Sequence, residues 1–336
     1  MRVRRVRIVA LLIAAATLAF VSGCSSSGSS GAAPPTVEKP DLNVAVVPAL
    51  DSAGFFVALY EGLFAKAGLH VNFTPAVSSD TVINAQVKGQ YDITGGNYVS
   101  YIQAQQEGKA NLDIFAEGSV MEPGTQGIYT MPGSKITSMA ALKGKTIAIN
   151  AQRNILYLLA ASMMAERGMS PKSVKWVNVP FPKMAAELES GAIDAALLPE
   201  PFASEAEQTY GAVPLVDLNQ GATVSFPIAG YVATKGWAAK NPHTLAAFYR
   251  ALEQGERIAD TDRAAVERAM ESLPVKPVPL AVSSQTAAVM ALDSYPVSPG
   301  PVGSVDVVRL QRVVNVMQQF LGSPKFDIKT MLINGG

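Results

Sequence analysis

The sequence contains one order of strands and helices twice, about a hundred residues apart, and this repeat constrains its fold more than any other feature. In each copy a short helix is expected to end at a glycine, and a new strand is expected to begin at the aspartate three residues later. These residues are Gly89 and Asp92 in the first copy, and Gly191 and Asp194 in the second. Alternating strands and helices favour parallel strands joined by right-handed crossovers. The sequence therefore predicts an α/β fold with two similar lobes; a chance likeness between two α/β segments is the alternative.

The two lobes are expected to be joined where strand-like segments interrupt this alternation. The first copy begins with a strand at 43–47 and one helix over 53–66, and the second copy repeats this plan. The interruptions lie at 127–131 and 226–234, and the second of them is expected to return the chain to its first lobe. The predicted organisation is lobe 1 over 41–128, lobe 2 over 129–225, and a return to lobe 1 with C-terminal helices over 226–336.

The N-terminus has the pattern of an export signal. Four arginines stand among the first seven residues, and an apolar run over 8–21 follows them. The run ends in Val21-Ser22-Gly23-Cys24, which resembles the lipobox of bacterial lipoproteins. This resemblance implies a signal peptide over 1–23, a diacylated Cys24, and an extracytoplasmic protein held to the cell membrane by lipid. An ordinary secreted protein is the alternative. The Ser-, Gly- and Pro-rich stretch that follows predicts a flexible tether over 24–40.

Composition argues against several classes of function. The chain has 27 basic and 27 acidic residues, and removal of the four signal arginines leaves a formal charge of −4. This balance does not suit a nucleic-acid partner. Cys24 is the only cysteine, and His70 and His243 are the only histidines. We therefore expect no metal site, no cofactor, no Cys-His nucleophile and no enzymatic activity. The protein is also expected to be a monomer.

Three blocks of sequence carry a family resemblance: FFVALYEGLFAKAGL from Phe55, GSKITSMAALKGKTIAIN from Gly133, and AALLPEPF from Ala195. They resemble solute-binding proteins of ABC importers, in the family that binds sulfonates, taurine, nitrate or pyrimidine precursors of thiamine. The resemblance implies a type II periplasmic binding protein, in which two Rossmann-like lobes close on a small-molecule ligand like a Venus flytrap. It also implies delivery of the ligand to an ABC permease with its ATPase. A ligand sensor that partners a membrane signalling protein is the alternative, followed by an enzyme on the same fold.

The ligand site is expected beyond the carboxyl ends of the strands, where loops lead into helices. The loops at 48–54 and 95–98 would supply it from lobe 1, and those at 150–154 and 199–202 from lobe 2, with an aromatic wall from 180–182. The candidate ligand-binding residues are Asp51, Ser52, Gly96, Asn97, Tyr98, Glu122, Asn150, Gln152, Arg153, Asn154, Phe181 and Glu200.

The chemistry of these candidates leaves two ligand classes open. Helix N-termini at Asn97 and Asn154, together with Arg153, would suit an anionic group such as a sulfonate. Acidic side chains and aromatic rings in the same loops would instead suit a heteroaromatic ligand with N–H donors. Some candidates also have structural alternatives: Asp51 as a helix cap, and Glu200 as a hinge residue.

Overall fold

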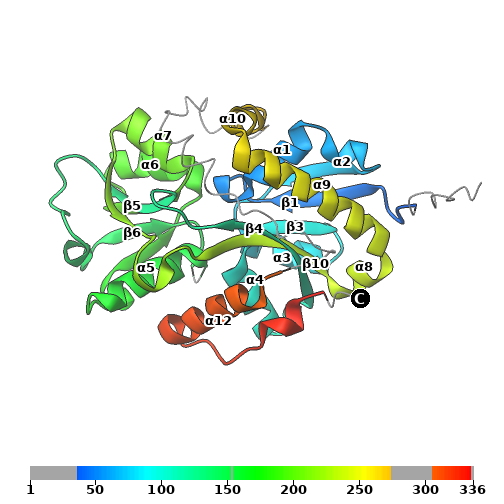
Figure 1. The fold of residues 1–336 in the computed structure, drawn as a ribbon. Helices are drawn as coiled ribbons and strands as arrows, with labels where there is room; N and C mark the ends of the chain where they lie inside the picture. The colour runs from blue at the N-terminus through cyan, green and yellow to red at the C-terminus, as the bar shows by residue number, and fades with distance from the viewer. Residues whose placement is uncertain (1–35, 153, 274–304, 334–336) are drawn as a thin grey trace, which may run out of the picture. The chain divides into compact units, whose positions relative to one another are not determined.

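The computed structural model describes residues 36–152, 154–273 and 305–333. The expected signal peptide, the lipidation site Cys24 and Arg153 lie outside these residues. Two five-stranded sheets, each flanked by helices, make up the described part of the chain. Figure 1 shows the sheet of lobe 1 in blue and cyan, apart from its strand over 227–234 in yellow-green, and the sheet of lobe 2 in green. The α/β prediction is confirmed.

Lobe 1 has the strand order β2-β1-β3-β10-β4. Its first three strands are parallel, because each is followed by a helix that returns the chain to the same edge. The strands are β1 (Asp41–Val46), β2 (His70–Pro75), β3 (Ile93–Asn97), β4 (Leu112–Val120) and β10 (Pro227–Thr234). The helices between them are α1 (Ala53–Tyr60), α2 (Leu63–Lys66), α3 (Ser79–Val87) and α4 (Tyr98–Gln106).

Lobe 2 has the same plan, with the order β7-β6-β8-β5-β9. Strands β6, β7 and β8 take the places of β1, β2 and β3, and β5 takes the place of β10. The strands are β5 (Gln126–Thr130), β6 (Thr146–Ile149), β7 (Lys175–Asn178), β8 (Ala195–Pro199) and β9 (Val213–Asp217). The helices are α5 (Ile155–Glu166), α6 (Phe181–Glu189) and α7 (Phe202–Tyr210).

The expectation of parallel strands is wrong for one strand of each sheet. β10 runs antiparallel to β3 and β4, and β5 runs antiparallel to β8 and β9. Both β10 and β5 enter their sheet from the other lobe, so they run against the strands that their own lobe supplies. The expected boundary between residues 128 and 129 also falls inside β5, which belongs wholly to lobe 2. The first crossing therefore lies at 121–125, where Met121 donates its N–H to the carbonyl of Phe226 in the returning segment.

The folded body begins earlier than the expected end of the tether at residue 40. Val37 packs against the lobe 1 core, and the carboxylate of Glu38 accepts hydrogen bonds from the backbone N–H groups of His243 and Thr244. Lys39 pairs with Asp92 at 2.5 Å. These contacts bind residues 37–39 to lobe 1, and a composition-based reading of the tether does not detect them.

The single helix expected over 53–66 is two helices, α1 and α2. Gly62 between them has φ of 67°, a left-handed conformation that a helix cannot continue through. Glycine adopts this conformation without the steric cost that a Cβ would bring. The break lets α2 turn and pack Phe64 on Phe248, with ring centroids 4.7 Å apart.

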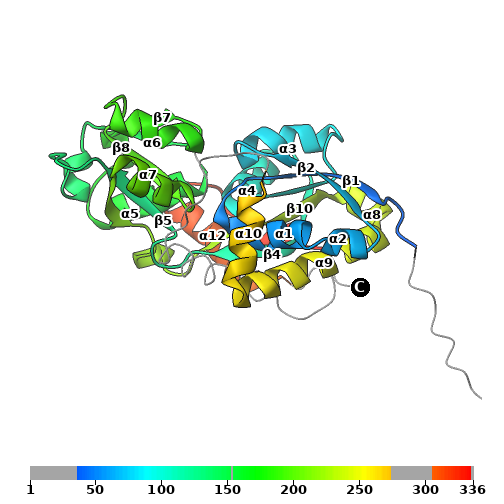
Figure 2. The ribbon, with the colours of Figure 1, turned by 90° about the horizontal axis from the view of Figure 1, so that it is seen from above.

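Helices after the return strand cover lobe 1 and reach lobe 2. α8 (Lys235–Lys240), α9 (Pro242–Thr261) and α10 (Arg263–Glu271) follow β10, and α9 and α10 both pack on α1. α12 (Val307–Leu321) packs on α4 of lobe 1 and on α5 of lobe 2. Figure 2 shows α9 and α10 beside α1. The expectation that these C-terminal helices belong to lobe 1 is therefore incomplete, since α12 also contacts a lobe 2 helix.

Candidate functional site

A pocket lies between the lobes, where the carboxyl ends of their parallel strands meet. It encloses about 430 Å³ of space free of protein atoms, part of which is open to solvent. Both lobes contribute to its lining, which comprises Val47, Ala49, Asp51, Ser52, Ser79, Gly96, Asn97, Gln126, Asn150, Asn154, Ile155, Leu156, Phe181, Pro199 and Ala229.

The wall from lobe 1 is built on Asn97 and Ser79. Asn97 is the N-cap of α4, and its Oδ1 accepts a hydrogen bond from the N–H of Ser100. Its own backbone N–H and its Nδ2 both donate to Ser79 Oγ, at 2.9 and 3.0 Å. Glycine at position 96 leaves room for this contact, because a Cβ there would lie 2.2 Å from Ser79 Oγ and would displace it. These hydrogen bonds therefore join the N-termini of α3 and α4 at the pocket.

The wall from lobe 2 combines a second asparagine pair with an aromatic ring. Asn154 is the N-cap of α5, accepting from the N–H of Tyr157, and its Nδ2 donates to Asn150 Oδ1. Phe181, at the start of α6, stacks on Phe202 with ring centroids 5.2 Å apart and an angle of 25° between the planes. This stack gives the lobe 2 side of the pocket a flat apolar face.

One hydrogen bond joins the two lobes at the pocket. Gln126 Nε2, on β5 of lobe 2, donates to Asp51 Oδ1 of lobe 1 at 3.2 Å. Burial raises the pKa of Asp51 to about 7, and the hydrogen bond from Gln126 opposes this shift. Gln126 is 1% exposed, and its Oε1 is buried without a hydrogen-bond partner among the described residues.

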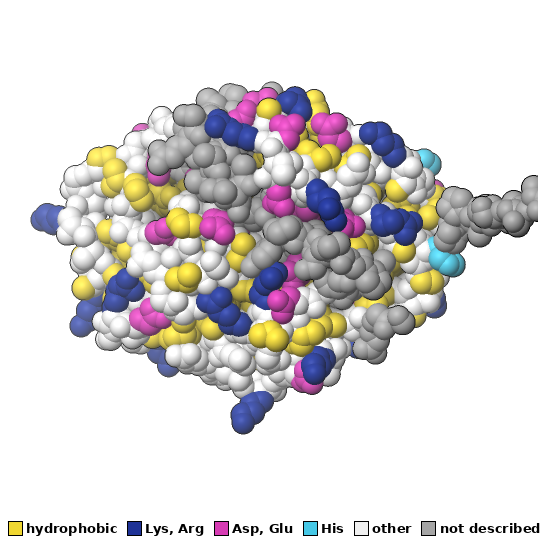
Figure 3. Space-filling view, in the orientation of Figure 1, with side chains coloured by type: hydrophobic (Ala, Val, Ile, Leu, Met, Phe, Trp, Pro, Cys, Tyr) yellow, Lys and Arg dark blue, Asp and Glu magenta, His cyan; other side chains and the backbone are white. Residues whose placement is uncertain are grey.

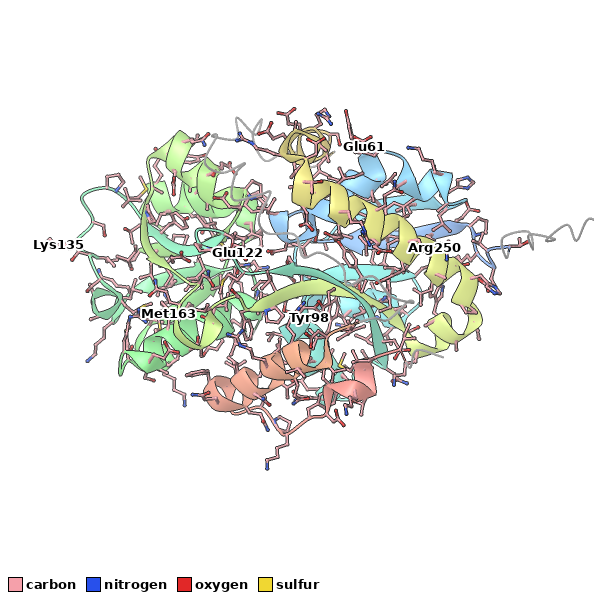
Figure 4. All side chains as sticks on the ribbon, viewed as in Figure 1. Glu61, Tyr98, Glu122, Lys135, Met163 and Arg250 are labelled. Atoms are coloured by element: carbon pink, nitrogen blue, oxygen red, sulfur yellow. The ribbon has the colours of Figure 1, made fainter. Side chains whose placement is uncertain are left out.

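Four of the predicted site residues lie outside the pocket lining, and two of these have buried structural roles. Tyr98 points into the lobe 1 core, and a Cβ on Gly230 of β10 would lie 2.5 Å from its hydroxyl oxygen. Figure 4 shows Tyr98 on the side of the sheet that faces α12. The side chain of Glu200 binds the N–H and hydroxyl of Ser204 in α7, and burial raises the pKa of Glu200 to about 7.

The backbone of Glu200 also joins the lobes. Its N–H donates to the carbonyl of Thr125 in the first crossing, and its carbonyl accepts from the N–H of Leu50 in lobe 1. Glu200 therefore stabilises the junction between the lobes and does not line the pocket.

Glu122 and Gln152 are the other two predicted residues outside the lining. Glu122 lies in the first crossing, where its backbone forms a turn with Thr125, and Figure 4 places it between the lobes. Gln152 is exposed to solvent. The remaining candidates within the described residues line the pocket: Asp51, Ser52, Gly96, Asn97, Asn150, Asn154 and Phe181.

Sequence reasoning missed Ser79 and Gln126. Ser79 begins the helix after β2, so the rule that selects loops after parallel strands could have found it. Gln126 begins an antiparallel strand, which that rule does not cover. Its position at the carboxyl edge of lobe 2 follows only from the crossing of the chain between the lobes.

Charge around the pocket is sparse. Asp51 is the only ionisable side chain among the described lining residues. Basic and acidic side chains are interspersed over the face shown in Figure 3. The described residues contain no group of three or more His, Cys, Asp or Glu that could hold a metal ion. None of their helices is long and apolar enough to cross a bilayer.

Comparison with known proteins agrees with this architecture. Residues 49–264 match the family described as NMT1/THI5 like. The chain belongs to the NMT1/THI5-like family. Comparison with curated proteins finds no match.

Solved structures that are similar in fold to this family member show the two lobes of type II periplasmic binding proteins. The alkanesulfonate-binding protein SsuA from Xanthomonas axonopodis, bound to MOPS, is 19% identical, with a TM-score of 0.70 over 86% of this chain and 96% of that one. The ligand-binding component of an ABC-type import system from Staphylococcus aureus is 13% identical, with a TM-score of 0.72 over 88% and 97%. The nitrate-binding protein NrtA from Synechocystis is 17% identical, with a TM-score of 0.60 over 70% and 67%. The predicted fold class is confirmed.

Proposed function

We propose that this protein is an extracytoplasmic solute receptor that captures a small organic ligand between its lobes and delivers it to an ABC importer. The observation that carries the proposal is the pocket itself, whose polar lining comes from helix N-termini and strand ends of both lobes. A ligand that contacts both walls favours the arrangement in which the walls are close together. Membership of the NMT1/THI5-like family supports this function, as does similarity to solute-binding components of importers.

The proposal includes an anchor on Cys24. The Val21-Ser22-Gly23-Cys24 sequence supports diacylation of the cysteine, which would hold the receptor near its permease. Metabolic labelling with a fatty-acid probe tests this part, with Cys24→Ala as the comparison. Equal labelling of the two proteins would rule the anchor out and leave the binding function to be judged separately.

Ligand capture is tested by identifying what copurifies with the secreted protein and titrating it by calorimetry. Asn97→Ala on lobe 1 and Asn154→Ala on lobe 2 should each weaken binding about tenfold or more, because each removes the side chain that orders one wall. Asn72→Ala is the matched control, since Asn72 is exposed on β2, away from the pocket. Unchanged affinity in both pocket variants would show that the ligand binds elsewhere.

Delivery to an importer is tested in cells. Deletion of the gene should abolish uptake of the labelled ligand, and the wild-type copy should restore it. Loss of a signalling response with intact uptake would instead support the sensor function.

A further inference from the structure

A second cavity lies in lobe 2, at the opposite edge of its sheet from the pocket between the lobes. Its lining comes from the turns that precede β6 and β7, so it lies at the amino ends of these strands. The first turn contains the short 3-10 helix η2 (Met139–Leu142), and the second contains η3 (Pro171–Ser173). The cavity has a volume of about 580 Å³, which can hold a small organic ligand. The function proposed above gives it no role.

Backbone hydrogen bonds hold the two turns together. The N–H of Gly144 donates to the carbonyl of Ser173 at 2.7 Å, and the N–H of Lys175 donates to the carbonyl of Lys145 at 2.8 Å. Within the second turn, the hydroxyl of Ser173 donates to the carbonyl of Ser170 at 2.6 Å. The cavity is therefore a fixed feature of the folded lobe.

Two cationic side chains line this cavity, and none of its described lining residues is acidic. Lys143 is exposed and forms no ion pair within the described residues. The guanidinium of Arg167 donates to the carbonyl of Met163 at 3.2 Å and to Gln220 Oε1 at 3.1 Å, which fixes its position and leaves other N–H groups to donate. An ammonium and a guanidinium in one cavity suit an oxyanion.

The surrounding chain strengthens this preference for negative charge. Between residues 133 and 175 the sequence has seven basic residues and one acidic residue, Glu166. The carboxylate of Glu166 accepts from the N–H of Ala222 at 2.8 Å, and Lys145 pairs with Asp194 at 3.4 Å. Lys135, which Figure 4 places at the end of lobe 2 far from lobe 1, adds to the excess of positive charge. Such an excess creates a positive potential that attracts anions, and salt weakens it.

Apolar side chains and a hydroxyl complete the lining. Met139 is 5% exposed, and Met169 is half-buried. Methionine side chains are flexible and can pack on apolar groups of varied shape. Ser138 precedes η2, but its hydroxyl does not cap this helix and can donate to a ligand.

We infer that this cavity is a second binding site, which takes an organic phosphate with an apolar part. A phosphate monoester carries a charge of about −1.5 to −2 and three acceptor oxygens, whereas a carboxylate or sulfonate carries a single charge. Lys143, Arg167 and Ser138 bind the phosphate oxygens, and Met139 and Met169 pack on the apolar group. The site is separate from the one between the lobes and binds independently of it.

Calorimetry with hexyl phosphate tests the inference on the secreted protein at low salt. Hexyl phosphate should bind, and inorganic phosphate should bind about tenfold more weakly because it leaves the methionines uncovered. Lys143→Gln should weaken hexyl phosphate binding about tenfold. Lys172→Gln is the matched control, since it removes the same charge from an exposed residue that does not line the cavity. This control and Asn154→Ala, in the pocket between the lobes, should leave the affinity unchanged.

Three outcomes would overturn the inference. The first is that hexyl phosphate does not bind to a protein with intact far-UV circular dichroism. The second is an equal loss of affinity in Lys143→Gln and Lys172→Gln, which would mean that surface charge alone attracts the compound. The third is a loss in Asn154→Ala without a loss in Lys143→Gln, which would place the compound between the lobes. All three leave the receptor function proposed above standing.

Vesicles identify the source of the phosphate. The secreted protein is sedimented with vesicles of phosphatidylcholine that contain phosphatidic acid, whose head group is a phosphate monoester. A larger bound fraction for wild type than for Lys143→Gln, with no such difference for Lys172→Gln, would assign the site to a lipid head group. Equal bound fractions, together with binding of hexyl phosphate, would assign it to a soluble phosphate ester.

Discussion

The aspartates that precede β3 in lobe 1 and β8 in lobe 2 make the same hydrogen bonds in different surroundings. Asp92 accepts from the N–H of Asn43 at 2.9 Å, and Asp194 accepts from the N–H of Thr146 at 2.8 Å. Each also pairs with a lysine. The Asp92 side chain is only 5% exposed, whereas that of Asp194 is 38% exposed. The chain that enters lobe 1 at residues 37–39 supplies Lys39 to Asp92, and lobe 2 has no such entering segment.

The two lobes are alike at the amino ends of their strands and differ at the carboxyl ends. The repeated turn stabilises the amino ends of the strands, far from the pocket, and it is the same in both lobes. The carboxyl ends carry the pocket, and there the lobes differ. Lobe 1 presents Asp51 and Ser79, while lobe 2 presents Gln126 and the pair of asparagines. A shared scaffold thus carries two different sets of binding groups.

The largest effect should come from removing the buried member of the aspartate pair. Asp92→Ala leaves the N–H of Asn43 and the ammonium group of Lys39 without their partner, and should lower the free energy of unfolding by about 3 kcal/mol. Asp194→Ala, at the more exposed site, should lower it by about 1 kcal/mol. Urea unfolding of both variants measures the difference. Equal losses would mean that burial does not distinguish the two lobes at this turn.

A second test concerns Asp51, because the described pocket lining from lobe 2 contains no acidic residue. Burial raises the pKa of Asp51 to about 7, so ionisation costs stability progressively as the pH rises from about 4 through 7. In the absence of ligand, Asp51→Asn should be more stable than wild type by about 2 kcal/mol at pH 8, and the difference should vanish near pH 4. Unfolding midpoints across this range measure it, with the exposed Asp41→Asn as control. A constant difference at all pH values would contradict the prediction.

The third test concerns residues 37–39, the entering segment that packs on lobe 1 and has no counterpart in lobe 2. Burial opposes ionisation of Glu38, but hydrogen bonds from the N–H groups of Thr244 and His243 outweigh it and lower its pKa to about 2. The stabilisation from Glu38 is present above pH 4.5 and is lost as the pH falls toward 2. Glu38→Gln should therefore cost about 1 kcal/mol at pH 7 and nothing at pH 2. Thermal unfolding at the two pH values measures this. An equal cost at both would assign the effect to packing.

The smallest effect is expected where α12 holds the segment that returns from lobe 2. Arg312 donates to the carbonyl groups of Ala222, Val224 and Ser225, and its guanidinium lies 5.4 Å from the centre of the Phe226 ring. Arg312→Met should cost about 0.5–1 kcal/mol, because much of this contact is exposed to solvent. Arg250→Met, on the outer face of α9 in Figure 4, is the control. Equal unfolding free energies for the two variants would show that α12 does not stabilise the connection through Arg312.

The sequence was a good guide to local structure and a poorer one to contacts between distant residues. Strands, helices and the return near residue 226 follow from local periodicity, which does not depend on the rest of the fold. The antiparallel direction of β5 and β10 depends on the path between lobes, which periodicity does not encode. Glu200 looked like a ligand contact because it ends a strand at the right edge. Its side chain accepts hydrogen bonds from the N–H and hydroxyl of Ser204 in α7, a contact that the position of Glu200 at a strand end does not predict.

The placement of β10 has a consequence for the order in which the chain acquires its structure during synthesis. All strands of lobe 2 come from one uninterrupted stretch that ends at Asp217, so its sheet can form once that residue is available. The sheet of lobe 1 cannot be completed until later. Its strands β3 and β4 are not neighbours, and β10, which lies between them, is synthesised after the whole of lobe 2. Until β10 arrives, β3 and β4 each have an unpaired edge, which is the surface that other chains can pair with. The protein is therefore most exposed to pairing with other chains during the time in which lobe 2 is synthesised.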